Sequence, residues 1–169
     1  HIRCIYEDQN GIFWIGTHHG IYLYNPNTKN FSKPESINTA IRDNILRSIT
    51  GDKAGFIYVA TFGKGLTQFS PTGKRTGFQD LSKGFPSNTI NTVYCDLHGE
   101  IWAGTRKGLI HFNTKNGKTD LNQYTVYDER QGLSNSCIRA CIDTVFFSRF
   151  RPCQTPFAAL NIAFVLYFA

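Results

Sequence analysis

The amino-acid sequence predicts an all-β fold, a β-propeller segment of three four-stranded antiparallel blades followed by the start of a fourth. The main observation is an internal repeat: "DQNGIFWIGT" at residues 8–17 recurs as "DKAGFIYVAT" at 52–61 and as "DLHGEIWAGT" at 96–105. The copies lie 44 residues apart, a period at which each copy builds one supersecondary unit. Composition agrees, because 14 Phe, 8 Tyr and 15 Gly among 169 residues favour strands and tight turns.

Each copy opens with a short strand and a tight turn. Apolar residues two or three positions apart predict the first strand. The predicted first strands are "IRCIY" (2–6), "ILRSI" (45–49) and "INTVY" (90–94). An Asp-x-x-Gly turn then starts at Asp8, Asp52 and Asp96. Its carboxylate can accept hydrogen bonds from the backbone N–H groups just ahead, and its glycine supplies the positive φ that closes the turn.

Two further strands follow the turn, joined by a short loop. The second strand carries one aromatic residue per copy, at Trp14, Tyr58 and Trp102, which we expect to pack between neighbouring sheets. The loops to the third strand are "THHG" (17–20), "TFGKG" (61–65) and "TRKG" (105–108), and the third strands are "IYLYN", "LTQFS" and "LIHFN".

A weaker fourth strand is expected near Phe31, at 77–78 and at 123–126, before a Pro-, Ser- and Asn-containing connector. Four short strands per repeat, without helical periodicity, are the unit of a propeller blade. The predicted organisation is a partial propeller over 1–143 and an atypical apolar tail over 144–169. The predicted blades span 2–44, 45–89 and 90–136, with the start of a fourth at 137–143.

The repeat resembles the two-component regulator propeller family, whose pattern is "VxxIxEDxxGxLWIGTxxGL" with "GLxxN" before the next copy. The resemblance is carried by "IRCIYEDQNGIFWIGTHHGIYLYN", "ILRSITGDKAGFIYVATFGKGLTQFS" and "INTVYCDLHGEIWAGTRKGLIHFN". The connectors "GFPSNT" (84–89) and "GLSNSC" (132–137) match the turn between blades, so the resemblance covers about residues 2–143.

The family resemblance implies a function. Such propellers form the periplasmic sensor region of bacterial hybrid sensor histidine kinases, especially those of Bacteroidetes, and bind polysaccharide breakdown products. By this resemblance the chain is a ligand-sensing fragment of a parent protein anchored in the inner membrane, and it is not itself an enzyme. The expected partners are an oligosaccharide ligand, preferably an acidic one, further propeller blades of the parent chain, and a second copy of the parent in a homodimer.

The tail departs from the repeat. A fourth copy aligned on Ile90 and Asp96 would place its turn after Ile138, but the turn Asp and Gly are missing. The segment from Val145 onward has no acidic residue and no glycine, and its apolar stretch at 157–169 is short for a bilayer span. We expect a foreign or out-of-frame end, in which case another reading frame beyond codon 143 would encode the Asp-x-x-Gly turn.

Candidate ligand-binding residues lie where the propeller topology brings loops together. The loops between the second and third strands share a face with the connectors, around the mouth of the central channel. The loop residues are His18, His19, Phe62, Lys64, Arg106 and Lys107. The connectors add Asn44, Asn88 and Asn135. Amides and cations suit sugar hydroxyls and acidic groups, and an aromatic ring suits stacking on a sugar, so the sequence predicts weak, salt-sensitive binding of acidic oligosaccharides.

Other chemistries have less support in the residues. Adjacent side chains such as His18 and His19 point to opposite faces of a strand, and the five cysteines follow neither the repeat nor a CxxC pattern, so no metal, cofactor or disulfide framework is predicted. The net charge of +6 is scattered, which gives little support for nucleic acid as a partner. The alternatives are a propeller glycosidase or lyase, which needs an acid at a rim that shows only bases, and a protein-interaction propeller without a small ligand.

Overall fold

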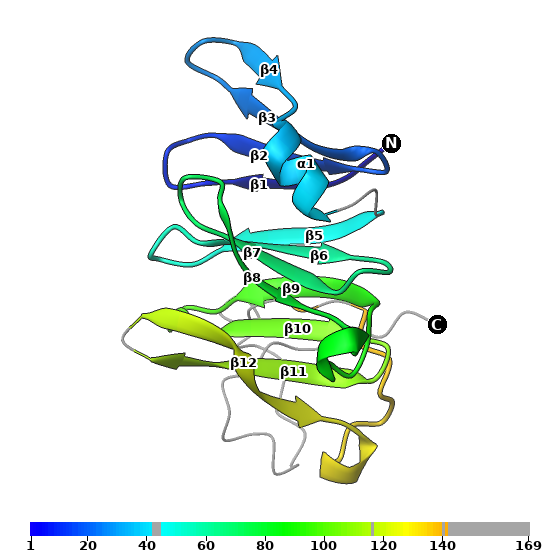
Figure 1. The fold of residues 1–169 in the computed structure, drawn as a ribbon. Coiled ribbons are helices and arrows are strands. Elements are labelled where there is room, and N and C mark those ends of the chain that lie inside the picture. Colours follow the sequence, from blue (N-terminus) through cyan, green and yellow to red (C-terminus); the bar gives the residue numbers. More distant parts are fainter. Residues whose placement is uncertain (42–44, 116, 140, 142–169) are drawn as a thin grey trace, which may run out of the picture.

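In a computed structural model, the chain forms three four-stranded sheets that stack one on the next (Figure 1). The structure describes residues 1–41, 45–115, 117–139 and 141. In every sheet the strands follow chain order and neighbouring strands run antiparallel. The predicted all-β propeller class is therefore confirmed.

The strands carry the labels of Figure 1. The first blade comprises β1 (Ile2–Glu7), β2 (Phe13–Thr17), β3 (Gly20–Asn25) and β4 (Asn30–Ser32). The second comprises β5 (Leu46–Gly51), β6 (Ile57–Thr61), β7 (Leu66–Phe69) and β8 (Arg75–Gln79). The third comprises β9 (Ile90–Cys95), β10 (Ile101–Thr105), β11 (Gly108–Lys115) and β12 (Lys118–Tyr127). The first strands β1, β5 and β9 contact one another in turn, so they form the inner side of the stack.

The connectors between blades contain helical turns that the sequence analysis did not predict. An α-helix, α1 (Glu35–Ile41), follows β4 and buries Ile37 and Ile41. These two residues are one helical turn apart, so a single short face suffices to attach the helix. The Asn38 amide ties α1 to β3, accepting from the backbone N–H of Ile21 at 2.8 Å and donating to its carbonyl at 3.0 Å. Short 3₁₀ helices, η1 (Leu81–Lys83) and η2 (Glu129–Gln131), follow β8 and β12.

The hydrophobic core lies between blades rather than within them. One cluster joins the first two blades and includes Trp14, Ile49, Ile57, Val59 and Phe69. A second joins the next two and includes Tyr58, Ile90, Val93, Ile101 and Phe112. Trp14 and the fully buried Tyr58 thus pack against the next sheet, and Trp102 packs with Leu109, Ile138 and Cys141.

The repeated Asp and the repeated aromatic residue form one hydrogen-bonded unit. In the second copy, Oδ1 of Asp52 accepts from the backbone N–H groups of Ala54 and Phe56, and its Oδ2 accepts from the Tyr58 hydroxyl at 2.8 Å. In the other copies Asp8 and Asp96 bind their two turn N–H groups in the same way and accept from the indole Nε1 of Trp14 and Trp102. We call this unit the Asp–aromatic clasp. It fixes the turn to the core.

Candidate functional site

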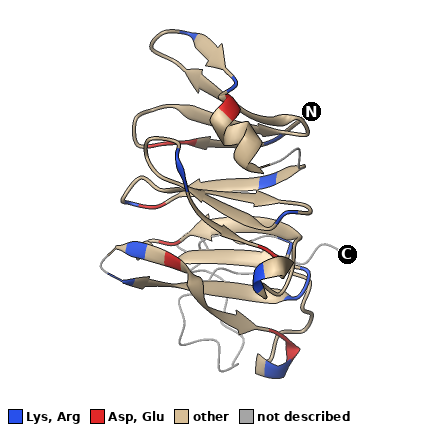
Figure 2. Cartoon of the chain, viewed as in Figure 1, with Lys and Arg blue, Asp and Glu red and all other residues tan. Residues whose placement is uncertain are grey.

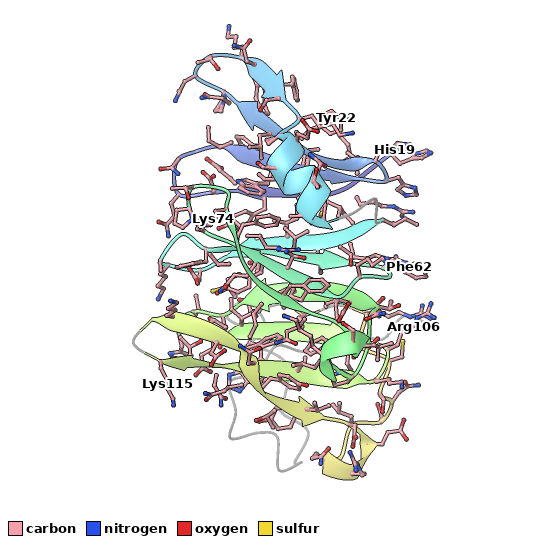
Figure 3. All side chains as sticks on the ribbon, in the orientation of Figure 1. His19, Tyr22, Phe62, Lys74, Arg106 and Lys115 are labelled. Atoms are coloured by element: carbon pink, nitrogen blue, oxygen red, sulfur yellow. The ribbon has the colours of Figure 1, made fainter. Side chains whose placement is uncertain are left out.

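The strand registers place the loops predicted to bind ligand at one end of every sheet. Thr17 pairs with Gly20, and Thr105 pairs with Gly108, so the loops between them lie at the end opposite the Asp-x-x-Gly turns. Connectors reach the same end, because Gly65 N donates to the carbonyl of Asn88 at 2.9 Å. We call this end the rim. In Figure 3 His19, Phe62 and Arg106 lie along one side of the stack, and Lys74 and Lys115 lie on the opposite side.

The repeated threonine builds each rim loop. Its hydroxyl donates to the carbonyl of the glycine that ends the loop, at 2.9 to 3.0 Å, and accepts from a backbone N–H inside the loop. The residues that do so are Thr17, Thr61 and Thr105. The loops are therefore held in one shape while their remaining side chains differ, which is the arrangement expected of a recognition surface on a rigid scaffold.

The histidine loop of the first blade is less cationic than its sequence suggests. Arg3 Nε donates to Nε2 of His18. Desolvation, followed by the positive charges of Arg3 and the N-terminus, lowers the pKa of His18 below its usual value. His18 acts as the acceptor in this contact, and Arg3 carries the positive charge of the pair. His19 is exposed.

The connector asparagines are engaged by the backbone. Oδ1 of Asn88 accepts from the backbone N–H of Leu81 at 2.7 Å, and Oδ1 of Asn135 accepts from that of Cys137 at 2.7 Å. Both residues lie at the rim as predicted, but these carbonyl oxygens hold the connectors in place. Asn44 lies outside the described residues.

Phe62 and Arg106 come together, while Lys64 and Lys107 stay at exposed loop positions. The guanidinium carbon of Arg106 lies 5.3 Å from the centre of the Phe62 ring, and that of Arg47 lies 4.7 Å from it. Both are cation–π distances. The backbone of Phe62 is fixed, since Phe62 N donates to the carbonyl of Ile45 and its carbonyl accepts from Thr89 Oγ1, both at 2.9 Å.

A hollow of about 340 Å³ opens at this place. It is lined by Arg47, Asn91, Arg106, Cys137 and Arg139. We call it the arginine hollow. Of the nine residues predicted from the sequence, Arg106 lines it and Phe62 contacts two of its guanidinium groups. Figure 2 shows Lys and Arg along the edge of the stack that carries the rim loops.

The sequence analysis missed the inner-strand residues of the arginine hollow. Arg47 and Asn91 hold the same position in successive repeats, 44 residues apart, and Arg139 follows Ile138 as Asn91 follows Ile90. The repeat register therefore contained the signal. Loop-tip positions alone do not reveal it, because Arg47 and Asn91 stand at the rim end of the first strands.

The rim also carries acidic residues, which corrects the prediction that it shows only bases. Asp80 and Asp128 cap η1 and η2, and Glu129 Oε1 accepts from Ser136 N at 3.2 Å. The bidentate contact with Arg130 lowers the pKa of Asp128 below its usual value. These carboxylates organise the connectors, and none of them lines the arginine hollow.

A second hollow, of about 470 Å³, separates the outer strands of the second and third blades. Phe78, Lys83 and Lys118 contribute to its walls, and Gln79 Nε2 donates to Asn122 Oδ1 at 2.7 Å between the two blades. It lies where β8 and β12 diverge, and the amide pair joins them.

The described part of the chain gives little support for metal binding or for thiol chemistry. No group of three His, Cys, Asp or Glu residues there could hold a metal ion. Cys4, Cys95, Cys137 and Cys141 are free thiols. None of the described helices is long and apolar enough to cross a lipid bilayer.

Comparison with known proteins gives the family. Residues 1–19 match the family model described as "Two component regulator propeller". The chain is 32% identical to the extracellular domain of a putative hybrid two component system from B. thetaiotaomicron, with a TM-score of 0.75 over 84% of this chain. The chain belongs to the two component regulator propeller family.

Further structures share the propeller fold. The extracellular domain of another putative hybrid two component system from B. thetaiotaomicron matches 84% of the chain with a TM-score of 0.60 at 23% identity. A virginiamycin B lyase from Staphylococcus aureus matches 70% of this chain and 40% of its own, with a TM-score of 0.50 at 13% identity. The propeller segment spans 19% of the length of each extracellular domain. No curated protein matches the chain.

Proposed function

We propose that the chain is part of the periplasmic ligand-sensing region of a hybrid two component sensor, and that its rim binds an oligosaccharide. The observation that carries the proposal is the arginine hollow at the rim, beside the ring of Phe62. Guanidinium groups can bind hydroxyl and acidic groups, and a flat ring can stack on a sugar. The resemblance to extracellular domains of hybrid two component systems supports the sensor role and the periplasmic location.

A non-enzymatic role is part of this proposal. Hydrolysis or elimination at a glycosidic bond requires an acid or base positioned at the reacting atoms. The carboxylates of Asp80, Asp128 and Glu129 cap η1 and η2 or hold a connector, and the lining of the arginine hollow contains none. The rim is therefore equipped to bind rather than to cleave.

Calorimetric titration with neutral and acidic oligosaccharides tests the proposal. We expect the acidic ones to bind more tightly and to weaken as salt rises, since exposed charges are screened beyond about 8–10 Å near physiological ionic strength. The double variant Arg106→Ala/Lys107→Ala should weaken binding. The matched control is Lys74→Ala/Lys115→Ala, which removes the same charge from the opposite side of the stack.

The results of the titration distinguish a rim site from attraction by net charge. Binding that is lost only in the rim variant supports the proposal. Equal losses in both variants would indicate attraction by net charge alone and would contradict a rim site. The absence of binding by any oligosaccharide, neutral or acidic, would contradict the proposal altogether.

A further inference from the structure

The arginine hollow joins a recurrent position of the inner strands to one rim loop. Arg47 on β5 and Asn91 on β9 occupy the second position of the first strand in adjacent repeats, and β5 contacts β9. Arg139 stands at the same position after the third blade, next to the buried Ile138. Arg106 enters from the loop between β10 and β11. Three arginines from three separate chain segments thus line one hollow.

The charge of this cluster is not neutralised by the described residues. Among the described residues, ion pairs join His111 to Glu100 and Arg130 to Asp128, and neither pair includes an arginine of the hollow. The lining contains an amide and a thiol but no carboxylate. Like charges held together repel one another, and an anion between them removes that cost.

The geometry of Arg47 points to a missing acceptor. Its Nε is buried and has no hydrogen-bond partner among the described residues. Its guanidinium carbon is held 4.7 Å from the Phe62 ring. A buried N–H of a charged group without an acceptor is costly, so an acceptor from outside the chain would stabilise this arrangement. Asn91 is fixed beside it, because its Nδ2 donates to the carbonyl of Ile138 at 2.9 Å.

We propose that Arg47, Arg106 and Arg139 form a site for one oxyanion, a carboxylate or a sulfate, carried by the ligand, with Asn91 beside it. This inference rests on the proposed function and makes it more specific. The acidic group of the ligand is held by these three arginines at the rim, and the exposed loop lysines Lys64 and Lys107 contribute only long-range attraction. Guanidinium groups suit both anions, because their forked donors match two oxygens at once.

Titration of the chain with inorganic sulfate at constant ionic strength tests the site directly. We compare Arg47→Gln/Arg139→Gln with Lys64→Gln/Lys107→Gln, which removes the same charge from the rim outside the hollow. The arginine variant should bind sulfate about tenfold more weakly or worse, as expected for the loss of charge-assisted hydrogen bonds. The lysine variant should change by no more than about twofold, as screened surface charges do. Equal effects of the two variants would overturn the site.

Cys137 provides a second readout, because it lines the same hollow. Sulfate should slow alkylation of Cys137 by iodoacetamide in the parent chain but not in the arginine variant. Peptide mass spectrometry separates Cys137 from the other cysteines. Since Arg139 is exposed, Arg139→Gln alone serves if the double variant does not fold. Unchanged alkylation at saturating sulfate would contradict the location.

Small sugars distinguish the source of the anion and separate this inference from the proposed function. Glucuronate and glucose 6-sulfate should compete with sulfate, and the one that competes at lower concentration identifies the preferred group. Glucose should not compete. If a neutral oligosaccharide binds the rim while sulfate and both acidic sugars do not, the anion site is wrong and the proposed function stands. If sulfate binds in the hollow but no oligosaccharide does, the anion site stands and the proposed function fails.

Discussion

At the scale of the residue, the Asp–aromatic clasp explains why two positions recur together. The sequence predicted the turn hydrogen bonds of Asp8, Asp52 and Asp96 and, separately, the packing of Trp14, Tyr58 and Trp102. It did not predict the bond between the two. Only the folded sheet shows that a carboxylate six residues before the ring reaches the ring's polar atom, because the turn folds β6 back beside β5.

Substitution of Asp52 tests the clasp. Asp52→Ala removes the acceptor of two turn N–H groups and of the buried Tyr58 hydroxyl, so we expect a loss of about 2–4 kcal/mol in the free energy of unfolding. Tyr58→Phe removes the bond that the hydroxyl donates to Asp52 and the one that it accepts from Gln68 Nε2, but it leaves the turn N–H groups bonded, so it should cost less, about 1–2 kcal/mol. Urea unfolding at pH 7 measures both. Equal losses from the two changes would show that the turn N–H groups contribute nothing.

The buried thiols give a prediction for pH. Burial raises the pKa of Cys4 and of Cys95 to about 11 and that of Cys141 to about 12. The thiolate is the reactive form, so alkylation of these three residues in the folded chain should stay slow at pH 8 and accelerate only as pH approaches 11. Mass spectrometry of timed samples measures the rates, with the urea-unfolded chain as the fast control.

The same raised values bear on stability at alkaline pH. The folded chain retains these thiol protons at pH values where the unfolded chain has lost them. The contribution of the buried thiols to the free energy of unfolding is therefore complete below the unfolded pKa, near pH 9. This contribution is lost as pH rises through the pKa values of the thiols in the folded chain. Rapid alkylation of the folded chain at pH 8 would show that the thiols are more accessible than their burial indicates.

At the scale of the element, the strands were more predictable than the connectors. All twelve described strands overlap segments that the repeat had indicated as strands. The helix α1 was missed because only two large apolar residues, Ile37 and Ile41, carry its pattern, and the Asn38 contact with β3 that holds it is made across the fold. Periodicity in so short a segment does not separate a helix from a loop.

The rim loop of the second blade provides a test of loop geometry. Gly65 has φ of +77° and a Cβ added there would fall on the carbonyl oxygen of Gln79, whereas Gly99 has φ of +85° with open space around it. Both Gly→Ala changes introduce the left-handed strain, about 1–2 kcal/mol. Gly65→Ala should cost about 1–3 kcal/mol more because of the clash with backbone.

Urea unfolding of the two glycine variants gives the difference. Gly65→Ala should also weaken ligand binding at the rim, since the loop also carries Phe62, whereas Gly99→Ala should not, because its turn lies at the opposite end. Equal destabilisation by the two changes would mean that the rim loop moves away from β8 freely.

At the scale of the whole molecule, the first blade has a face that its counterparts bury. Ile2 and Ile5 are 62% and 58% exposed. The residues at the same repeat positions of the next two blades, Leu46 and Ile49 and then Ile90 and Val93, are between 0% and 7% exposed because the preceding blade covers them. Beside them run two rows of paired residues, Ile5–Ile15–Tyr22 and Phe13–Tyr24–Phe31.

This exposed face predicts association. A contiguous apolar surface with Phe31 67% exposed is larger than isolated surface residues usually provide, and stacked repeats depend on neighbours to cover such faces. We expect the chain to self-associate reversibly at micromolar concentration, and Ile5→Lys/Phe31→Lys to shift it toward the monomer without loss of the sheets. Leu97→Lys, at an exposed position in a turn, is the control and should leave association unchanged. Sedimentation velocity over a concentration series measures the shift. A parent chain that remains monomeric across the series would show that this face is tolerated in water.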